Sequence, residues 1–477
     1  MEAHQARRSA YKMRARAAFS TLLSSPATPA VAVGSVAAVV LARMRLASSP
    51  IASPDAWAYS AWGQAIARGE RPPYELSATT PKPLATILGA MAAPLTAPKG
   101  VAVVVALALA TLIGSLFFIG FREAGAIGAV VPIVALFAAT EIGTSFRSAH
   151  IDIVVAALVV LGVALKRFGR VVPWGLAALL RPEAWILTAF GGFLAINGNW
   201  RRKALLGVGI GLVPVILWAA FDFLTAGDPL ATTHWRQNRR ALLHAFRTPA
   251  EGQLPGFVAA WLGEDVTRII VVLLGLLGLS AVIYKARTGA RLEKSVPLIV
   301  GLVWVSALTV ERFLGQSRFQ PRYVLPSMAM FALGCGFLGV LVTRNLRGPV
   351  SRAAAAAVGV AVVALFASNV YLSYTSPGTP YRVLAEGLDE ALTCGRVVMM
   401  GDEGTPSRIT KLIAASREPA SKFTFILSAE GTRPSEIDGR VAAVLRSPEA
   451  SMALPEWKRR VRTAYGVLAI APSCAQR

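Results

Sequence analysis

The chain of 477 residues is 55% hydrophobic and only 16% charged, whereas soluble globular proteins carry about a quarter charged residues. Its mean hydropathy of +0.55 excludes an ordinary water-soluble protein and indicates one that lies in a lipid bilayer. The formal net charge is +23, but the basic residues lie in short tracts between apolar segments, so we interpret the charge as membrane topology and expect no nucleic-acid partner.

The N-terminal segment 1–27 is basic between Arg7 and Arg16 and precedes a first apolar segment, 28–47. A signal peptide is the alternative, but no clear small-residue cleavage site follows, so we predict an uncleaved membrane helix. Further apolar segments occupy 101–119, 126–143, 151–165, 171–197, 203–225, 266–284, 296–314, 323–342 and 351–374. Most of them are long enough to cross a hydrocarbon layer of about 30 Å.

Two segments decide the topology. Segment 84–97 is short and contains Pro94, and segment 171–197 is interrupted by Arg181-Pro182-Glu183. If the first lies at the membrane surface and the second is a hairpin of two half-length helices, every basic tract between segments is cytoplasmic. If instead the first spans and the second crosses once, a basic tract at 166–170 lies outside. We therefore predict about eleven membrane helices, a cytoplasmic N-terminus and an exoplasmic C-terminus.

The topology divides the chain into a transmembrane domain, 28–375, with a long exoplasmic loop at 48–100, and a small exoplasmic α/β domain, 376–477. In the soluble domain we predict strands at 396–400, 423–427, 440–445 and 465–471. Cys394 and Cys474 flank these strands. We expect a disulfide between them, with two buried free thiols as the alternative. Cys335 lies in a membrane segment and is interpreted as a packing residue.

The unusual polar residues of the transmembrane domain gather on the predicted exoplasmic face. Ser53-Pro54-Asp55 is typical of a helix start, with Ser53 as the cap. Asp55 also lies beside Trp57 and Tyr59, and its carboxylate can accept a proton from a hydroxyl substrate. Lys82 is held between two prolines and is either a membrane-surface anchor or a phosphate contact.

Further along the same face, His150 and Asp152 are two candidate metal ligands without a third, which is a weak metal signal. Arg181 and Glu183 interrupt an apolar segment, and such charges either pair with each other or mark a site. His234 belongs to a polar cluster that follows Gly227-Asp228-Pro229.

Basic residues on the exoplasmic face run against the topology rule, so Arg322, beside Tyr323, indicates an anionic ligand. The sequence contains no Walker-type loop, dinucleotide fingerprint, Ser-His-Asp pattern or paired CxxC. It therefore gives no support for ATP or nicotinamide use.

The order of these motifs resembles the C-type (GT-C) glycosyltransferase superfamily, which includes polyprenyl-phosphate-sugar-dependent mannosyl- and arabinosyltransferases. The resemblance covers about residues 28–375. It rests on Ser53-Pro54-Asp55, Thr80-Pro81-Lys82-Pro83-Leu84, His150-Ile151-Asp152, Leu180-Arg181-Pro182-Glu183-Ala184, Gly227-Asp228-Pro229-Leu230 and Arg322-Tyr323-Val324-Leu325-Pro326. The second motif departs from the family's Lys-Pro-Pro-Leu, because Leu84 follows one proline rather than two. The C-terminal domain carries no specific match.

The resemblance implies an inverting transfer of a sugar from a polyprenyl-phosphate donor to a glycan, glycolipid or protein hydroxyl outside a bacterial cytoplasmic membrane. Asp55 would then be the catalytic base, and Asp152 would orient it or the acceptor. Lys82, Arg181, Arg322 and Tyr323 would bind the donor phosphate, and Trp57, Tyr59, His150, Glu183 and His234 would contact substrate. No cofactor is implied, and a divalent metal is possible but unsupported. The alternative is a transporter or flippase of a lipid-linked or anionic solute, although no internal repeat is visible.

Overall fold

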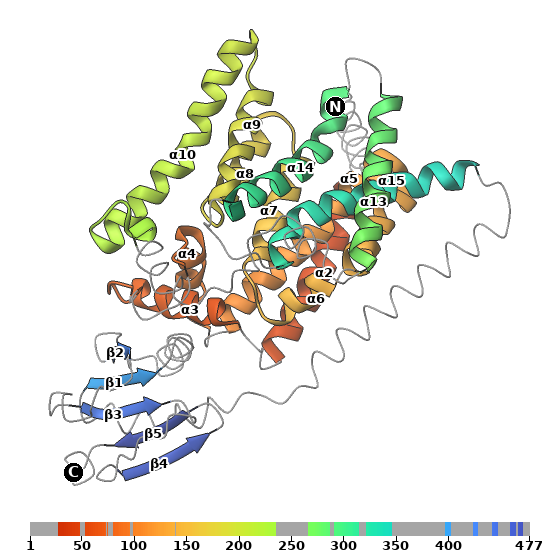
Figure 1. Ribbon diagram of the computed structural model, residues 1–477. Helices are drawn as coiled ribbons and strands as arrows, with labels where there is room; N and C mark the ends of the chain where they lie inside the picture. Colours follow the sequence, from red (N-terminus) through yellow and green to blue (C-terminus); the bar gives the residue numbers. More distant parts are fainter. Residues whose placement is uncertain are drawn as a thin grey trace, which may run out of the picture.

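A computed structural model describes residues 27–47, 53–72, 74, 80–95, 99–138, 140–234, 266–286, 291–313 and 321–345, together with five strands between 396 and 470. The part up to residue 345 is almost entirely helical (Figure 1). Among the described residues, six helices are long and apolar enough to cross a membrane. The chain is therefore a multi-pass membrane protein. The predicted total of about eleven helices stays a prediction, because segment 351–374 lies outside the described residues.

The six membrane-length helices match segments that the hydropathy pattern predicts. They are α2 (Ala27–Ala47), α5 (Lys99–Ala138), α10 (Trp200–Ala226), α13 (Val266–Lys285), α14 (Arg291–Phe313) and α15 (Leu325–Asn345). Helix α15 packs against α13 and α5 and lies between them (Figure 1). A side chain at Gly275, Gly278 or Gly334 would overlap the backbone of the opposite helix, so glycine permits this close approach. Cys335 is buried there and its thiol donates to the Val271 carbonyl at 3.4 Å.

Helix α5 joins two predicted segments through a sharp reversal at Gly125, whose φ of 69° is left-handed. A methyl group at Gly120 would overlap the backbone of Gly128, so the two halves lie against each other as a hairpin. The second half ends at Ala138, and a separate helix α6 covers Thr140–Arg147. The predicted apolar segment 126–143 is thus divided between α5 and α6, and α6 continues to Arg147. Glu141 in the first turn of α6 and Arg147 in its last turn suit the helix dipole, which favours a helix here.

The interrupted segment 171–197 forms two short helices, as predicted. Helix α8 covers Val171–Ala178 and α9 covers Trp185–Ala195, with a 3-10 turn η3 (Pro182–Ala184) between them. The two helices pack against each other, beside α10 (Figure 1). Each is too short to cross a bilayer. Helix α7 (Asp152–Ala164) and a further turn η2 (Arg167–Arg170) lead into this hairpin.

The long loop 48–100 contains two short helices, α3 (Pro54–Ala67) and α4 (Pro83–Met91). The Ser53 hydroxyl accepts a hydrogen bond from the Ala56 amide at 3.2 Å, so the predicted helix start is confirmed. Helices α3 and α4 touch through glycines, because a methyl at Gly63 would overlap the backbone of Gly89 and Ala90. This contact fixes the distance between Asp55, which begins α3, and Lys82, which precedes α4.

The five described C-terminal strands form one mixed sheet. They are β1 (Arg396–Gly401), β2 (Phe423–Leu427), β3 (Val441–Arg446), β4 (Lys458–Thr463) and β5 (Gly466–Ile470), in the order β2-β1-β3-β5-β4. Strand β1 is parallel to β2 and β3, whereas β5 is antiparallel to β3 and β4. The four predicted strands are present, and β4 was missed. The predicted helices of this domain, with Cys394 and Cys474, lie outside the described residues, so the α/β domain and the disulfide stay predictions.

Candidate functional site

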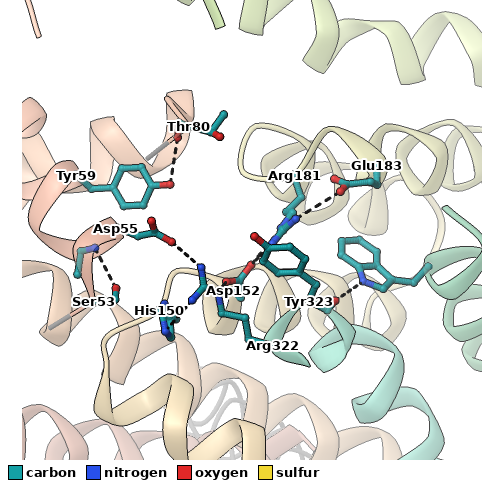
Figure 2. Close-up of polar contacts among 12 residues, drawn as sticks. Ser53, Asp55, Tyr59, Thr80, His150, Asp152, Arg181, Glu183, Arg322 and Tyr323 are labelled. Carbon is teal, nitrogen blue, oxygen red and sulfur yellow. Dashed lines mark hydrogen bonds and ion pairs between the residues drawn. The ribbon is translucent and has the colours of Figure 1, made fainter. Parts of the chain in front are cut away.

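Four segments that are far apart in the sequence meet at one place: the start of α3, the turn between α6 and α7, the tip between α8 and α9, and the turn η6 (Pro321–Val324) before α15 (Figure 2). Main-chain hydrogen bonds connect some of these segments and add the start of α4, which follows Lys82. The Ser53 amide donates to the Ser148 carbonyl at 2.7 Å, and the Leu84 amide donates to the Leu179 carbonyl at 3.3 Å. The predicted polar clusters, apart from the one at His234, therefore lie together.

Asp152 lies at the centre of this site, in the first turn of α7, and is 3% exposed. Its Oδ1 accepts hydrogen bonds from Arg181, from Nη2 at 2.8 Å and from Nε at 3.1 Å. Its Oδ2 lies 3.0 Å from Nε of Arg322. One buried carboxylate thus faces two arginines, and its single negative charge offsets part of the cost of burying them.

Arg181 lies at the tip of the α8–α9 hairpin and has a second acidic neighbour. Its Nη1 lies 3.5 Å from Oε1 of Glu183. Both residues are 6% exposed. The sequence left open whether these charges pair or mark a site, and the structure shows that they pair and that Arg181 also faces Asp152.

Arg322 joins three elements through three of its nitrogens. Nη2 donates to Oδ2 of Asp55 at 2.9 Å, and Nη1 donates to Nε2 of His150 at 3.0 Å. Its Nε faces Asp152, as described above. An arginine bonds only as a donor, so His150 accepts at Nε2 and carries its proton on Nδ1. Burial, and then the nearby charge of Arg322, lower the pKa of His150 to about 4, so the ring is neutral at neutral pH.

Lys82 is the cation of the site with the fewest side-chain contacts among the described residues. It is 9% exposed, and its Nζ lies 6.0 Å from the centre of the Tyr59 ring. Tyr59 itself is held by a hydrogen bond from its hydroxyl to the Thr80 carbonyl at 3.4 Å. Burial, and then the charge of Arg181, lower the pKa of Lys82 to about 8. A buried ammonium at this position is stabilised by an anionic ligand, because a negative charge offsets its desolvation.

Tyr323 and Trp304 support the two arginines. The guanidinium carbon of Arg181 lies 3.4 Å from the centre of the Tyr323 ring, and that of Arg322 lies 5.5 Å from it. The indole of Trp304, on α14, donates to the Tyr323 carbonyl at 2.8 Å and so holds η6 in place. The sequence analysis missed Trp304 and Thr80. Thr80 stands next to the Pro81-Lys82-Pro83 motif, whereas nothing in the sequence marks Trp304.

Two predicted substrate contacts lie differently from the rest. Trp57 is 9% exposed and belongs to the apolar core. His234 is largely exposed, and its Nδ1 pairs with Oδ2 of Asp228 at 2.6 Å. Asp55, Asp152, Lys82, Arg181, Arg322, Tyr323, Tyr59, His150 and Glu183 come together, but the contacts of His234 in the described part of the chain do not join it to them. A pattern of neighbouring polar residues does not show which side of a helix end each one faces, and His234 turns back to Asp228.

The site offers little to a metal ion. Among the described residues, no group of three His, Cys, Asp or Glu side chains is placed to hold one. His150 and Asp152, the two candidate ligands, both face arginine. A divalent-metal requirement therefore keeps no structural support in this part of the chain, and it stays untested.

The fold is similar to that of a solved protein structure. The scan against family models and the search of curated proteins found no match. Among solved structures, the chain matches ArnT from Cupriavidus metallidurans, crystallised with undecaprenyl phosphate. The TM-score is 0.51 and the identity 16%, and the match covers 93% of this chain and 98% of ArnT. This chain has the ArnT fold. At this identity the likeness shows the fold alone.

Proposed function

We propose that the chain is an inverting glycosyltransferase that moves a sugar from a polyprenyl-phosphate donor to an acceptor hydroxyl at the exoplasmic face of the membrane. The observation that carries the proposal is the meeting of Lys82, Arg181 and Arg322 with the carboxylates Asp55 and Asp152 on an ArnT-like fold. The cations match an anionic leaving group, and a carboxylate beside them matches a base.

The donor phosphate would bind beside Lys82. Arg181 is already shared between Asp152 and Glu183, and Arg322 between Asp152 and Asp55. Among the described residues, Lys82 forms no ion pair and faces the Tyr59 ring, so its charge is the most available to a phosphate. A sugar linked to a polyprenyl phosphate is a phosphodiester with one negative charge, and one available ammonium balances it.

The reaction would proceed in one displacement. Asp55 takes the proton of the acceptor hydroxyl as the oxygen attacks the anomeric carbon, and the bond from that carbon to the phosphate oxygen breaks. The bonding electrons leave with the phosphate, which gains a second negative charge. Lys82, Arg181 and Arg322 stabilise that developing charge. Because attack and departure occur on opposite faces of the sugar, the anomeric configuration inverts.

The first test is sugar transfer by the purified protein in nanodiscs. Each of a panel of radiolabelled polyprenyl-monophosphate sugars is presented with candidate acceptors, and wild type is compared with Asp55→Asn and Lys82→Ala. We expect sugar transfer or slow donor hydrolysis by wild type and a loss of at least about a hundredfold in Asp55→Asn, the usual contribution of general base catalysis. Full activity in Asp55→Asn would remove the base assignment.

The transporter hypothesis gives a different result in the same preparation. A flippase moves an intact lipid-linked sugar between leaflets, without cleaving the sugar–phosphate bond. Movement of a labelled donor across a proteoliposome membrane, with no cleaved sugar in any acceptor or in water, would replace the transferase proposal by that alternative.

A further inference from the structure

In the structure the proposed base, Asp55, pairs with Arg322. Asp55 accepts a hydrogen bond from Arg322 Nη2 at 2.9 Å, and the two side chains are 22% and 20% exposed. The bond to Arg322 uses one of the lone-pair sites of this carboxylate. Asp55 therefore offers both of its oxygens to an acceptor hydroxyl only after Arg322 has bonded to another anion.

Arg322 differs from Arg181 in how firmly it is held. Arg181 is enclosed, with an 8% exposed side chain, two nitrogens on Asp152 and a Tyr323 ring 3.4 Å away. Arg322 is more exposed and distributes its three contacts over two separate segments, the start of α3 and the turn between α6 and α7. A phosphate bound at Lys82 competes for the more accessible arginine, and Nη2 faces the least buried of its partners, Asp55.

His150 and Asp152 fix the guanidinium of Arg322. The neutral imidazole accepts from Nη1, and Asp152 faces Nε. Because the guanidinium is planar and rigid, these two contacts also set the position of Nη2. Nη2 can therefore exchange Asp55 for a phosphate only when the phosphate comes to it and the Asp55 carboxylate turns away.

We infer that Arg322 is a positioning residue that masks Asp55 until the phosphate of a lipid-linked donor takes over its Nη2. The inference rests on the proposed function and adds an order of events: the donor binds first, and only then does the base become available to an acceptor. Without a donor phosphate, Arg322 would thus occupy Oδ2 of Asp55, which hinders reaction with water or a stray hydroxyl.

The affinity for a lipid phosphate tests this role of Arg322 without any transfer reaction. The probe is undecaprenyl phosphate, whose dissociation constant is measured in nanodiscs for wild type, Asp55→Asn, Arg322→Gln and the double variant. Removing the competing carboxylate should tighten binding by about three- to tenfold in Asp55→Asn, the scale of a partly exposed ion pair. In the Arg322→Gln background the same change should have less than about a twofold effect, because the coupling energy of the double-mutant cycle resides in the pair.

Each outcome has a separate meaning. If Asp55→Asn tightens lipid binding equally in both backgrounds, or does not tighten it at all, Arg322 does not mask Asp55. The glycosyltransferase proposal would still stand. Absence of undecaprenyl phosphate binding by wild type overturns the donor proposal itself. Glu183→Gln removes a negative charge that pairs with Arg181 instead, so equal tightening there also counts against a specific role for Arg322. If Arg322→Gln does not fold, as judged by thermal unfolding and gel filtration, Arg322→Lys takes its place in the cycle.

Discussion

The guanidinium carbon of Arg181 lies 3.4 Å from the centre of the Tyr323 ring, while two of the Arg181 nitrogens bond to Asp152. The ring carries a negative face, so it stabilises the cation and fixes the direction in which its nitrogens point. Tyr323 comes from η6 and Arg181 from the α8–α9 tip, so this contact joins two of the four segments of the site.

A change of Tyr323 should therefore affect the proposed phosphate site through Arg181. Tyr323→Phe keeps the ring, and we expect undecaprenyl phosphate to bind within about twofold of wild type. Tyr323→Leu removes the ring, and we expect binding to weaken by about tenfold, in line with a desolvated cation–π contact. Equilibrium binding of labelled lipid distinguishes the two. Equal weakening in both variants would assign the effect to the hydroxyl group instead of the ring.

Lys82 predicts a pH dependence for the same binding. Burial lowers its pKa to about 8, so the ammonium that attracts phosphate is present below pH 8 and is lost as the pH rises above it. The second phosphate ionisation lies near pH 6, so the ligand charge is constant in that range. We expect the dissociation constant of undecaprenyl phosphate to rise by up to about tenfold per pH unit above pH 8.

The matched variant is Lys82→Arg, whose guanidinium stays charged throughout this range. Its dissociation constant should be flat between pH 8 and pH 10, even if it is weaker than that of wild type at neutral pH. A wild-type curve that is also flat would show that Lys82 does not carry the titration.

The glycine contact between α3 and α4 predicts a loss of function away from the charged residues. A methyl at Gly63 would overlap the backbone of Gly89, so Gly63→Ala must push α3 from α4 and separate Asp55 from Lys82. We expect transfer activity to fall by at least about tenfold, with a lower melting temperature, because overpacking costs about 1–3 kcal/mol. Gly209→Ala is the control, since a methyl there meets no described atom within 4 Å. Normal activity in Gly63→Ala would mean that this spacing is not needed.

A substitution at Trp304 should have a smaller effect on stability and lipid binding. Trp304→Phe deletes the indole hydrogen bond to the Tyr323 carbonyl, which is 2.8 Å long, and leaves that carbonyl without this donor. We expect about 1 kcal/mol less stability and a weaker affinity for undecaprenyl phosphate, because η6 carries both Arg322 and Tyr323. Trp218→Phe, on α10, deletes a comparable bond, to the Thr232 hydroxyl, and should lower stability alone. Unfolding and lipid binding are measured on both variants, and identical binding in both would separate Trp304 from the site.

Much of this architecture could be predicted from charge and hydropathy. The rule that basic tracts lie in the cytoplasm placed five charged residues on the opposite, exoplasmic face. The structure brings their side chains together: Asp55, Lys82, Asp152, Arg181 and Arg322. The rule works because a basic loop cannot easily be placed on the wrong side of a membrane. The break at Arg181-Pro182-Glu183 predicted the hairpin, because a hairpin there keeps every basic tract between segments on the cytoplasmic side.

The pairings within the site could not be predicted. Arg322 contacts Asp55 across 267 positions of sequence, and only the packing of α15 and η6 against the rest determines that distance. The reversal at Gly125 and the end of the helix at Ala138 depend on backbone contacts rather than on hydropathy. Strand β4 was missed because Lys458-Arg459-Arg460-Val461-Arg462-Thr463 is too basic to resemble a strand, although a charged strand is typical at the edge of a sheet.

The main-chain bonds from Ser53 to Ser148 and from Leu84 to Leu179 join the segments that carry the site. Neither bond involves a side chain, so almost any residue except proline can stand at the donor positions without breaking it. Lineages that share this framework are free to exchange most of their side chains while the relative positions of the reacting groups persist. A fold retained at 16% identity to ArnT is the outcome that such a framework permits.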